Sequence, residues 1–200
     1  VLPPTPYDAC DKQGTRVNSL SLVRYRNNDY SVPVVYGHRE VWIRGYVHEV
    51  VIGCGAEIIA RHPRSYDRAD MVFNPIHYLR LLEHKIGALD QAAPLVGWQL
   101  PDAFATLRRL LEARMGKSGK REFVQVLLLL ETFHLDELHG AVRHALRLGA
   151  IGYDAVKHLV LCRIERRPPR LNLMAYPYGP RPEGGTTSAS SSVGLLTGAA

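Results

Sequence analysis

The spacing of apolar residues changes once along this chain, near Tyr66. Between Val17 and Tyr66, β-branched residues recur at every second position, as Val41 and Ile43 do, in alternation with Trp42 and Arg44. A period of two is typical of β-strands that bury one face. Beyond Tyr66, apolar residues recur every three or four positions, which is the spacing of an amphipathic helix. The chain is therefore predicted to be α+β, with strands first and helices after.

About five short strands are predicted in residues 17–66. Turn-forming residues separate them at Asn27–Asp29, Gly37–His38 and Gly53–Gly55. Pro33 has no backbone N–H, so its strand should lie at an edge or a bulge. Short strands joined by tight turns are typical of closed barrels. We therefore expect residues 17–66 to form a small SH3-like β-barrel.

Residues 67–178 are predicted to form an α-helical region. Asn74–Pro75 is a helix start, with Asn as the N-cap and Pro at the first position, and Pro101–Asp102 starts a second helix. Gly116–Gly119 should break that helix as a basic loop. Phe123–Phe133 is apolar on nearly every side and should be a central helix. Two further helices are expected, at Leu135–Gly149 and Val156–Ile164.

The two ends of the chain differ in composition from the rest. Residues 1–16 are interpreted as a linker, because Pro3, Pro4 and Pro6 disfavour a helix. Residues 179–200 consist mainly of Gly, Ser, Thr and Pro, and are expected to be a disordered tail. The chain begins with Val1 rather than Met, which suggests a fragment or a processed start.

The net charge of +6 favours a polyanionic partner, most simply nucleic acid. The alternative is a solvated surface with an excess of arginine. No apolar run reaches the roughly 18 residues that a membrane span requires. Cys10, Cys54 and Cys162 are far apart, which fits neither a disulfide framework nor a zinc site and favours a reducing cytoplasm.

Common nucleotide and metal motifs are incomplete in this sequence. Gly116–Ser118 resembles part of a phosphate-binding P-loop, but that motif requires a glycine where this chain has Leu111. Nine histidines include no His-x-x-x-His pair, and the one helical pair of ligand type, His158 and Cys162, does not complete a tetrahedral site. We expect no cofactor and no metal in this chain.

Acidic residues also give no catalytic prediction. Two-metal phosphoryl transfer requires several carboxylates that converge on one site, and the acids here are scattered. We therefore assign no catalytic residue. The alternative is an enzyme with an unrecognised site around His77, Glu83 and His84.

Basic residues are the strongest indication of function. In the strands, arginines stand beside Tyr25, Trp42 and Tyr46, so guanidinium groups can pair with phosphates while the rings stack on bases or sugars. The alternative is that the rings fill the barrel and the arginines are simply exposed. A further group near the end of the last helix is explained by the helix dipole alone.

Candidate DNA contacts from the strands are Arg24, Arg26, Arg44, Arg61 and Arg64, and those from the helices are Arg108, Arg109, Lys117, Lys120 and Arg121. The weaker third group consists of Arg163, Arg166, Arg167 and Arg170. We expect the strand set to contribute more to DNA binding than the helical set, because its neighbouring rings can add stacking.

Several short motifs resemble transposases of the IstA type, which serve insertion sequences and are similar to phage Mu transposase and the retroviral integrases. The resemblance runs from about Tyr7 to Ser188. Its markers are Val23–Arg26, Asp29–Pro33, Ala60–Ser65, Pro75–Leu79, Leu82–Lys85, Gly87–Asp90 and Arg121–Phe123. Such transposases are expected to carry a helix–turn–helix region, a ribonuclease-H-like domain with an acidic triad and divalent metal, and then a barrel.

The resemblance implies a non-catalytic C-terminal fragment of a bacterial DNA transposase. Its barrel would bind double-stranded transposon-end or target DNA, largely through phosphates. Its helical region would support transposase self-association or contact an ATPase helper. Divalent metal is expected only for the catalytic domain, and the location is expected to be the cytoplasm, at the nucleoid. A protein–protein adaptor that contacts the helper without binding DNA is the alternative.

Overall fold

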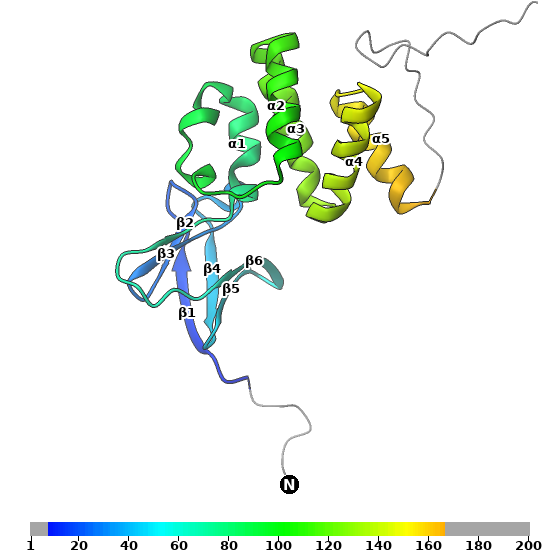
Figure 1. Ribbon diagram of the computed structural model, residues 1–200. Helices are drawn as coiled ribbons and strands as arrows, with labels where there is room; N and C mark the ends of the chain where they lie inside the picture. The colour runs from blue at the N-terminus through cyan, green and yellow to red at the C-terminus, as the bar shows by residue number, and fades with distance from the viewer. Residues whose placement is uncertain (1–7, 167–200) are drawn as a thin grey trace, which may run out of the picture.

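The computed structural model describes residues 8–166, which form two β-sheets followed by a helical bundle (Figure 1). The predicted α+β class is confirmed, with the strands in the first part of the described chain and the helices in the second. Among residues 8–166, none of the helices combines the length and the apolar character that a membrane span requires.

The larger sheet is antiparallel and has the strand order β1-β4-β5-β6. Its strands are β1 (Asp11–Arg16), β4 (Glu40–Gly45), β5 (Glu49–Cys54) and β6 (Glu57–Pro63). The hairpin between β5 and β6 turns at Gly55, whose φ of 59° lies in the left-handed region that favours glycine.

The smaller sheet has the strand order β2-β3-β7. β2 (Leu22–Tyr25) and β3 (Asn28–Ser31) form an antiparallel hairpin, and β7 (Met71–Val72) runs parallel to β3. A short 3-10 helix, η1 (Val34–Tyr36), follows β3. The two sheets share one buried cluster: Val17, Val23, Tyr25, Tyr30, Val32, Val41, Ile43, Val50, Ile52 and Ala60.

The two sheets correct part of the predicted architecture. A strand overlaps each of the five predicted ones, but β3 ends at Ser31, so Pro33 precedes η1 and is not in a strand as predicted. The strands are divided between two hydrogen-bonded sheets rather than closed into one, so the SH3-like barrel is not confirmed. Strand β1 lies inside residues 1–16, which were predicted to be a linker, and β7 lies beyond Tyr66. β1 escaped prediction because it is a polar edge strand whose residues are exposed or half-buried and show no alternation.

The helical part begins at Pro75 and has its own core. Its elements are η2 (Pro75–Tyr78), α1 (Leu79–His84), η3 (Ile86–Gln91), η4 (Ala93–Leu95), α2 (Asp102–Met115), α3 (Lys117–Leu128), η5 (Leu129–Glu131), α4 (Leu135–Leu148) and α5 (Tyr153–Ile164). Asn74 caps the first of them, since its Oδ1 accepts from the backbone N–H of Ile76 at 3.1 Å, as predicted. Residues 167–178 of the predicted helical region and the predicted disordered tail lie outside the described residues.

The predicted basic loop at Gly116–Gly119 is wrong. Gly116 alone separates α2 from α3, with a φ of 57°, and α3 starts at Lys117. Gly119 is buried in the first turns of α3, where a Cβ atom would overlap the backbone carbonyl of Leu111 in α2. The missing side chain therefore lets the two helices approach closely, and Lys117 lies on a helix instead of a loop.

Gly119→Ala should destabilise the chain by about 1–3 kcal/mol, because the added methyl group meets backbone atoms that cannot move aside without shifting a helix. Urea unfolding followed by circular dichroism measures this free energy of unfolding. Gly87→Ala is the control, since a Cβ there meets nothing within 4 Å. An equal free-energy change in both variants would contradict the close packing of α2 on α3.

Candidate nucleic-acid interface

The outer face of the larger sheet carries a row of cations. Lys12, Arg44, Val51 and Arg61 are direct neighbours across β1, β4, β5 and β6. Alternation in β4 produces this arrangement: Val41 and Ile43 are buried against the smaller sheet, so Trp42 and Arg44 point to the other face. The row therefore brings two of the predicted arginines, Arg44 and Arg61, onto one surface.

Trp42 occupies the neighbouring row of the same face. It lies opposite Gly14 in β1 and Gly53 in β5, and its indole lies over Gly53, where a Cβ atom would overlap the ring. The indole N–H donates to the carbonyl of Gly55 at 2.8 Å. The Arg44 guanidinium stacks on the ring, 4.7 Å from its centroid. These contacts fix an aromatic ring and a cation side by side.

Four of the five predicted strand arginines form ion pairs with acids of the chain itself. Arg24 forms a bidentate pair with Asp29 at 2.9 and 3.0 Å, and Arg26 pairs with Asp11 at 2.7 Å. Arg61 pairs with Glu49 at 3.2 Å. The side chains of Arg24, Arg26 and Arg61 remain more than half exposed, so the acids orient them without burying them.

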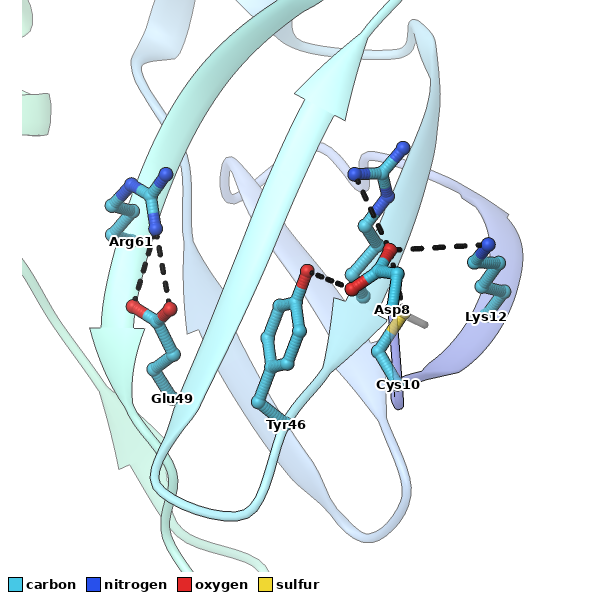
Figure 2. Close-up of polar contacts among 7 residues, drawn as sticks. Asp8, Cys10, Lys12, Tyr46, Glu49 and Arg61 are labelled. Atoms are coloured by element: carbon cyan, nitrogen blue, oxygen red, sulfur yellow. Dashed lines mark hydrogen bonds and ion pairs between the residues drawn. The ribbon is translucent and has the colours of Figure 1, made fainter. Parts of the chain in front are cut away.

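The fourth pair joins Arg44 to Asp8, and Figure 2 shows its surroundings. Asp8 Oδ2 lies 3.7 Å from Arg44 Nη1 and 3.9 Å from Lys12 Nζ, and Oδ1 accepts from the Tyr46 hydroxyl at 2.8 Å. The hydrogen bonds from Tyr46 and Cys10, together with the charges of Arg44 and Lys12, lower the pKa of Asp8 below its ordinary value. The carboxylate is therefore charged at neutral pH.

Arg64, the fifth candidate arginine of this set, forms no ion pair in the described part of the chain. Its Nη1 donates to the carbonyl of Tyr46 at 2.8 Å, and its guanidinium lies over the rings of Tyr66 and Tyr25, 4.7 and 5.5 Å from their centroids. The predicted neighbourhood of arginines and aromatic rings is thus present in the sheets, at Arg64 as well as at Arg44.

The helical set lies in the other part of the fold and is only partly available for a ligand (Figure 1). Arg108 and Lys120 both pair with Asp90, and Arg108 also pairs with Glu112 at 2.6 Å. These pairs tie η3 to α2 and α3. The remaining three cations of this set, Arg109, Lys117 and Arg121, form no ion pair within residues 8–166. Arg109 donates to the Thr106 hydroxyl at 3.4 Å, and Lys117 and Arg121 are one turn apart on α3.

The third basic group, at the end of α5, is only partly described. Arg163 packs its guanidinium against Gly140 of α4, where a Cβ atom would lie 2.6 Å from Arg163 Cζ. This contact gives Arg163 a packing role between the two helices. Arg167 and Arg170 lie outside the described residues.

Net charge is distributed unevenly between the two parts. Residues 8–73 have nine Lys and Arg against eight Asp and Glu, a net charge of +1. Residues 74–166 have thirteen against ten, a net charge of +3. The sheets therefore offer ordered cations beside aromatic rings, whereas the helices offer more surplus charge.

The proposed enzymatic cluster at His77, Glu83 and His84 is not assembled. No hydrogen bond or ion pair joins these three side chains in the described part of the chain, and Glu83 instead accepts from the Gln125 amide at 2.9 Å. No group of three or more His, Cys, Asp or Glu side chains among residues 8–166 could hold a metal ion. His77 instead contacts Ser31 and His62, which the sequence did not predict.

A buried polar network joins the smaller sheet to the first helical turn. Ser31 is fully buried; its Oγ accepts from the backbone N–H of Asn74 at 2.8 Å and is hydrogen-bonded to His77 Nδ1 at 2.9 Å. His62 Nε2 donates to the Ser31 carbonyl at 2.6 Å, and the two imidazole rings meet edge to face at 5.6 Å. Since Ser31 is inaccessible, this serine–histidine pair is a structural junction.

Burial lowers the pKa of His77 to about 4, and the neighbouring His62 contributes to the shift. Burial likewise lowers the pKa of His62. A charged imidazole would lose hydration in this junction, and no acid accepts from either ring among the hydrogen bonds of the described residues. The neutral forms of both rings are therefore part of the fold.

Comparison with known proteins gives consistent matches to transposases. Residues 2–74 match the family described as Mu transposase, C-terminal domain. The transposase for insertion sequences IS1326/IS1353 of Pseudomonas aeruginosa is 36% identical over 174 residues, which are 83% of this chain and 33% of that protein. A transposase of Aminobacter aminovorans is 35% identical over 149 residues, which are 72% of this chain and 28% of that protein.

The chain spans about a third of the length of the curated relatives it matches. No solved structure matches it significantly. The matched residues 2–74 end at Asn74, which caps the first helical turn, so within the described residues the family match covers both sheets.

Acid should destabilise the chain through His77. Its pKa is about 4 in the fold and near 6.5 when unfolded, so the unfolded chain binds more protons between these values and stability falls as the pH drops through that window. Between about pH 7 and pH 4.5 the loss should be on the order of 2–3 kcal/mol. Urea unfolding of wild type and His77→Gln at both pH values measures it, and the variant should show the smaller dependence. His84→Gln, which changes an exposed imidazole, is the control; identical pH dependence in all three chains would contradict this role of His77.

Proposed function

Because this chain is related to insertion-sequence transposases and carries the Mu transposase C-terminal domain at residues 2–74, we propose that it acts in DNA transposition by binding double-stranded DNA. The proposed DNA is the transposon end or the target. The bound groups are proposed to be mainly phosphates, because the exposed donors are arginines and lysines, which pair with phosphate oxygens.

One observation carries this proposal: ordered cations lie beside aromatic rings, on the outer face of the larger sheet at Arg44 and just beyond β6 at Arg64. Arg44 stacks on Trp42, and Arg64 stacks on Tyr66. A guanidinium that lies flat on a ring keeps its N–H edge available for phosphate oxygens. Neighbouring rings can add contacts to sugars or bases.

We assign no strand cleavage or joining to these residues. That chemistry requires carboxylates that converge on a metal ion, whereas Asp8, Asp11, Asp29, Glu49 and Asp90 are each engaged by arginine or lysine. In this proposal, catalysis belongs to other parts of a full-length transposase.

The helical part is proposed to support assembly of the transposase through protein contacts. A hollow of about 300 Å³ on this part is lined mostly by apolar residues of α2, α4 and the turn that follows α4, including Leu110, Leu146 and Ile151. Leu110 is 44% exposed, so this hollow presents apolar surface that a protein partner would cover. Self-association and contact with an ATPase helper are the two proposed uses. An adaptor that binds no DNA remains the second candidate function.

Binding of the chain to a duplex of about 30 base pairs, measured by fluorescence anisotropy between about 50 and 200 mM NaCl, tests the proposal. The logarithm of the binding constant should fall linearly with the logarithm of salt concentration, by about 0.9 per phosphate contacted. Replacing Arg24, Arg26 and Arg44 with Ala should flatten this slope more than replacing Arg109, Lys117 and Arg121, which removes the same charge from α2 and α3.

Circular dichroism and thermal melting confirm the fold of both triple variants before the comparison. If the helical variant alone lost binding, the DNA surface would be on α2 and α3. If the wild-type chain bound no DNA at about 50 mM salt, the adaptor function would replace DNA binding.

A further inference from the structure

Asp8 occupies an anion site that the sheet itself forms. Two cations, Arg44 and Lys12, and two neutral donors, the Tyr46 hydroxyl and the Cys10 thiol, converge on its one carboxylate (Figure 2). Lys12 and Arg44 come from adjacent strands, and Tyr46 follows β4 directly. Such a set of charged and neutral donors around one anion also suits a phosphate group, which presents oxygens in several directions.

A groove runs beside this anion site along β1 and β4. Gly14 forms the floor of this groove, since the space above it is open and a Cβ there would meet nothing within 4 Å. Trp42 is the residue paired with Gly14 on β4. One hollow of about 430 Å³ lies between Arg16 and Trp42, and another of about 270 Å³ lies between Lys12 and Arg44. Both include Gly14 and Trp42 in their walls, so they form one groove that leads to the cations around Asp8.

We propose that this groove binds the sugar–phosphate backbone of DNA, and that the Asp8 carboxylate holds the place of one phosphate until DNA displaces it. This rests on the proposed function and assigns it to one surface. Cations lie at both ends of this groove, Lys12 and Arg44 at one end and Arg16 at the other, and Lys12 and Arg16 are about 13 Å apart along β1. Over that length, one DNA strand presents several phosphates, at one per 3.4 Å of axis.

Exchange of the carboxylate for a phosphate is physically reasonable. The Asp8 side chain is 38% exposed, and its two ion pairs are long, at 3.7 and 3.9 Å. Exposed pairs of this kind contribute little to stability. Asp8 is charged at neutral pH, so its carboxylate has no proton to donate to a phosphate. It competes with phosphate for Lys12 and Arg44. Asp8 therefore weakens DNA binding without being required for the fold.

Asp8→Asn tests this directly, since it removes the competing charge and keeps the shape of the side chain. At about 100 mM NaCl, affinity for the duplex should rise by about three- to ten-fold. Asp67→Asn is the matched control, because Asp67 is exposed, its side chain forms no ion pair in the described part of the chain, and the change in net charge is identical. That control should raise affinity by less than about two-fold.

A second variant fills the groove without changing charge. Gly14→Val places a β-branched side chain, which suits a strand, on the floor of the groove. It should lower affinity several-fold while the melting temperature stays near that of wild type. Trp42 fluorescence gives a local signal once the other tryptophan, Trp98, is replaced by Phe, and duplex DNA should quench it in a salt-reversible manner.

Equal affinities of Asp8→Asn and Asp67→Asn, with binding of wild type intact and Trp42 emission unchanged by DNA, would overturn this site and leave the proposed function standing. Absence of DNA binding by the wild-type chain would overturn both. If Asp8→Asn were misfolded, undiminished binding by folded Gly14→Val would itself refute the groove.

Discussion

Burial of one face of β4 is the constraint on which the candidate interface depends. Val41 and Ile43 are 5% and 0% exposed between the two sheets, so Trp42 and Arg44 must face outward. A register slip of one residue would exchange the two faces. Two glycines secure the register: a side chain at Gly45 would overlap Tyr25, and one at Gly53 would overlap Trp42. The packing of the core therefore determines which chemistry the outer face displays.

Ion pairing then determines how strongly the two sheets attract a polyanion. Arginines that sequence reasoning would count as available cations are paired with Asp29, Asp11, Asp8 and Glu49. Acids that hold guanidinium groups in place reduce their conformational freedom before a ligand arrives, but they also compete with it. A sheet of this kind should favour ordered, moderately strong contacts with phosphates over purely electrostatic adhesion.

The sequence predicted those elements whose physical cause is local. Alternation identified β4, the turn at Gly55 identified the β5–β6 hairpin, and Asn74 with Pro75 identified the first helical turn. β1 was missed because an exposed polar edge strand has no hydrophobic pattern. The closed barrel was predicted from short strands and tight turns. These features describe local structure and do not specify which strands pair, so they did not indicate two separate sheets.

Side-chain partners that are distant in sequence could not be predicted in this way. Asp8 and Arg44 are 36 residues apart, and Ser31 and His77 are 46 apart; only the paired strands and the docked helical turn bring them together. Residue type did identify the candidate arginines. Their expected proximity to aromatic rings is confirmed for Arg44 beside Trp42 and for Arg26 beside Tyr25. Whether each arginine contacts DNA remains a prediction.

Amide chemical-shift mapping by NMR, with a labelled chain titrated with duplex DNA, tests the central claim most directly. The account predicts that the largest shifts occur in β1 and β4, at residues 11–16 and 40–45, and at the indole N–H of Trp42. Shifts concentrated in α3, at residues 117–128, with the sheet amides unchanged, would contradict it.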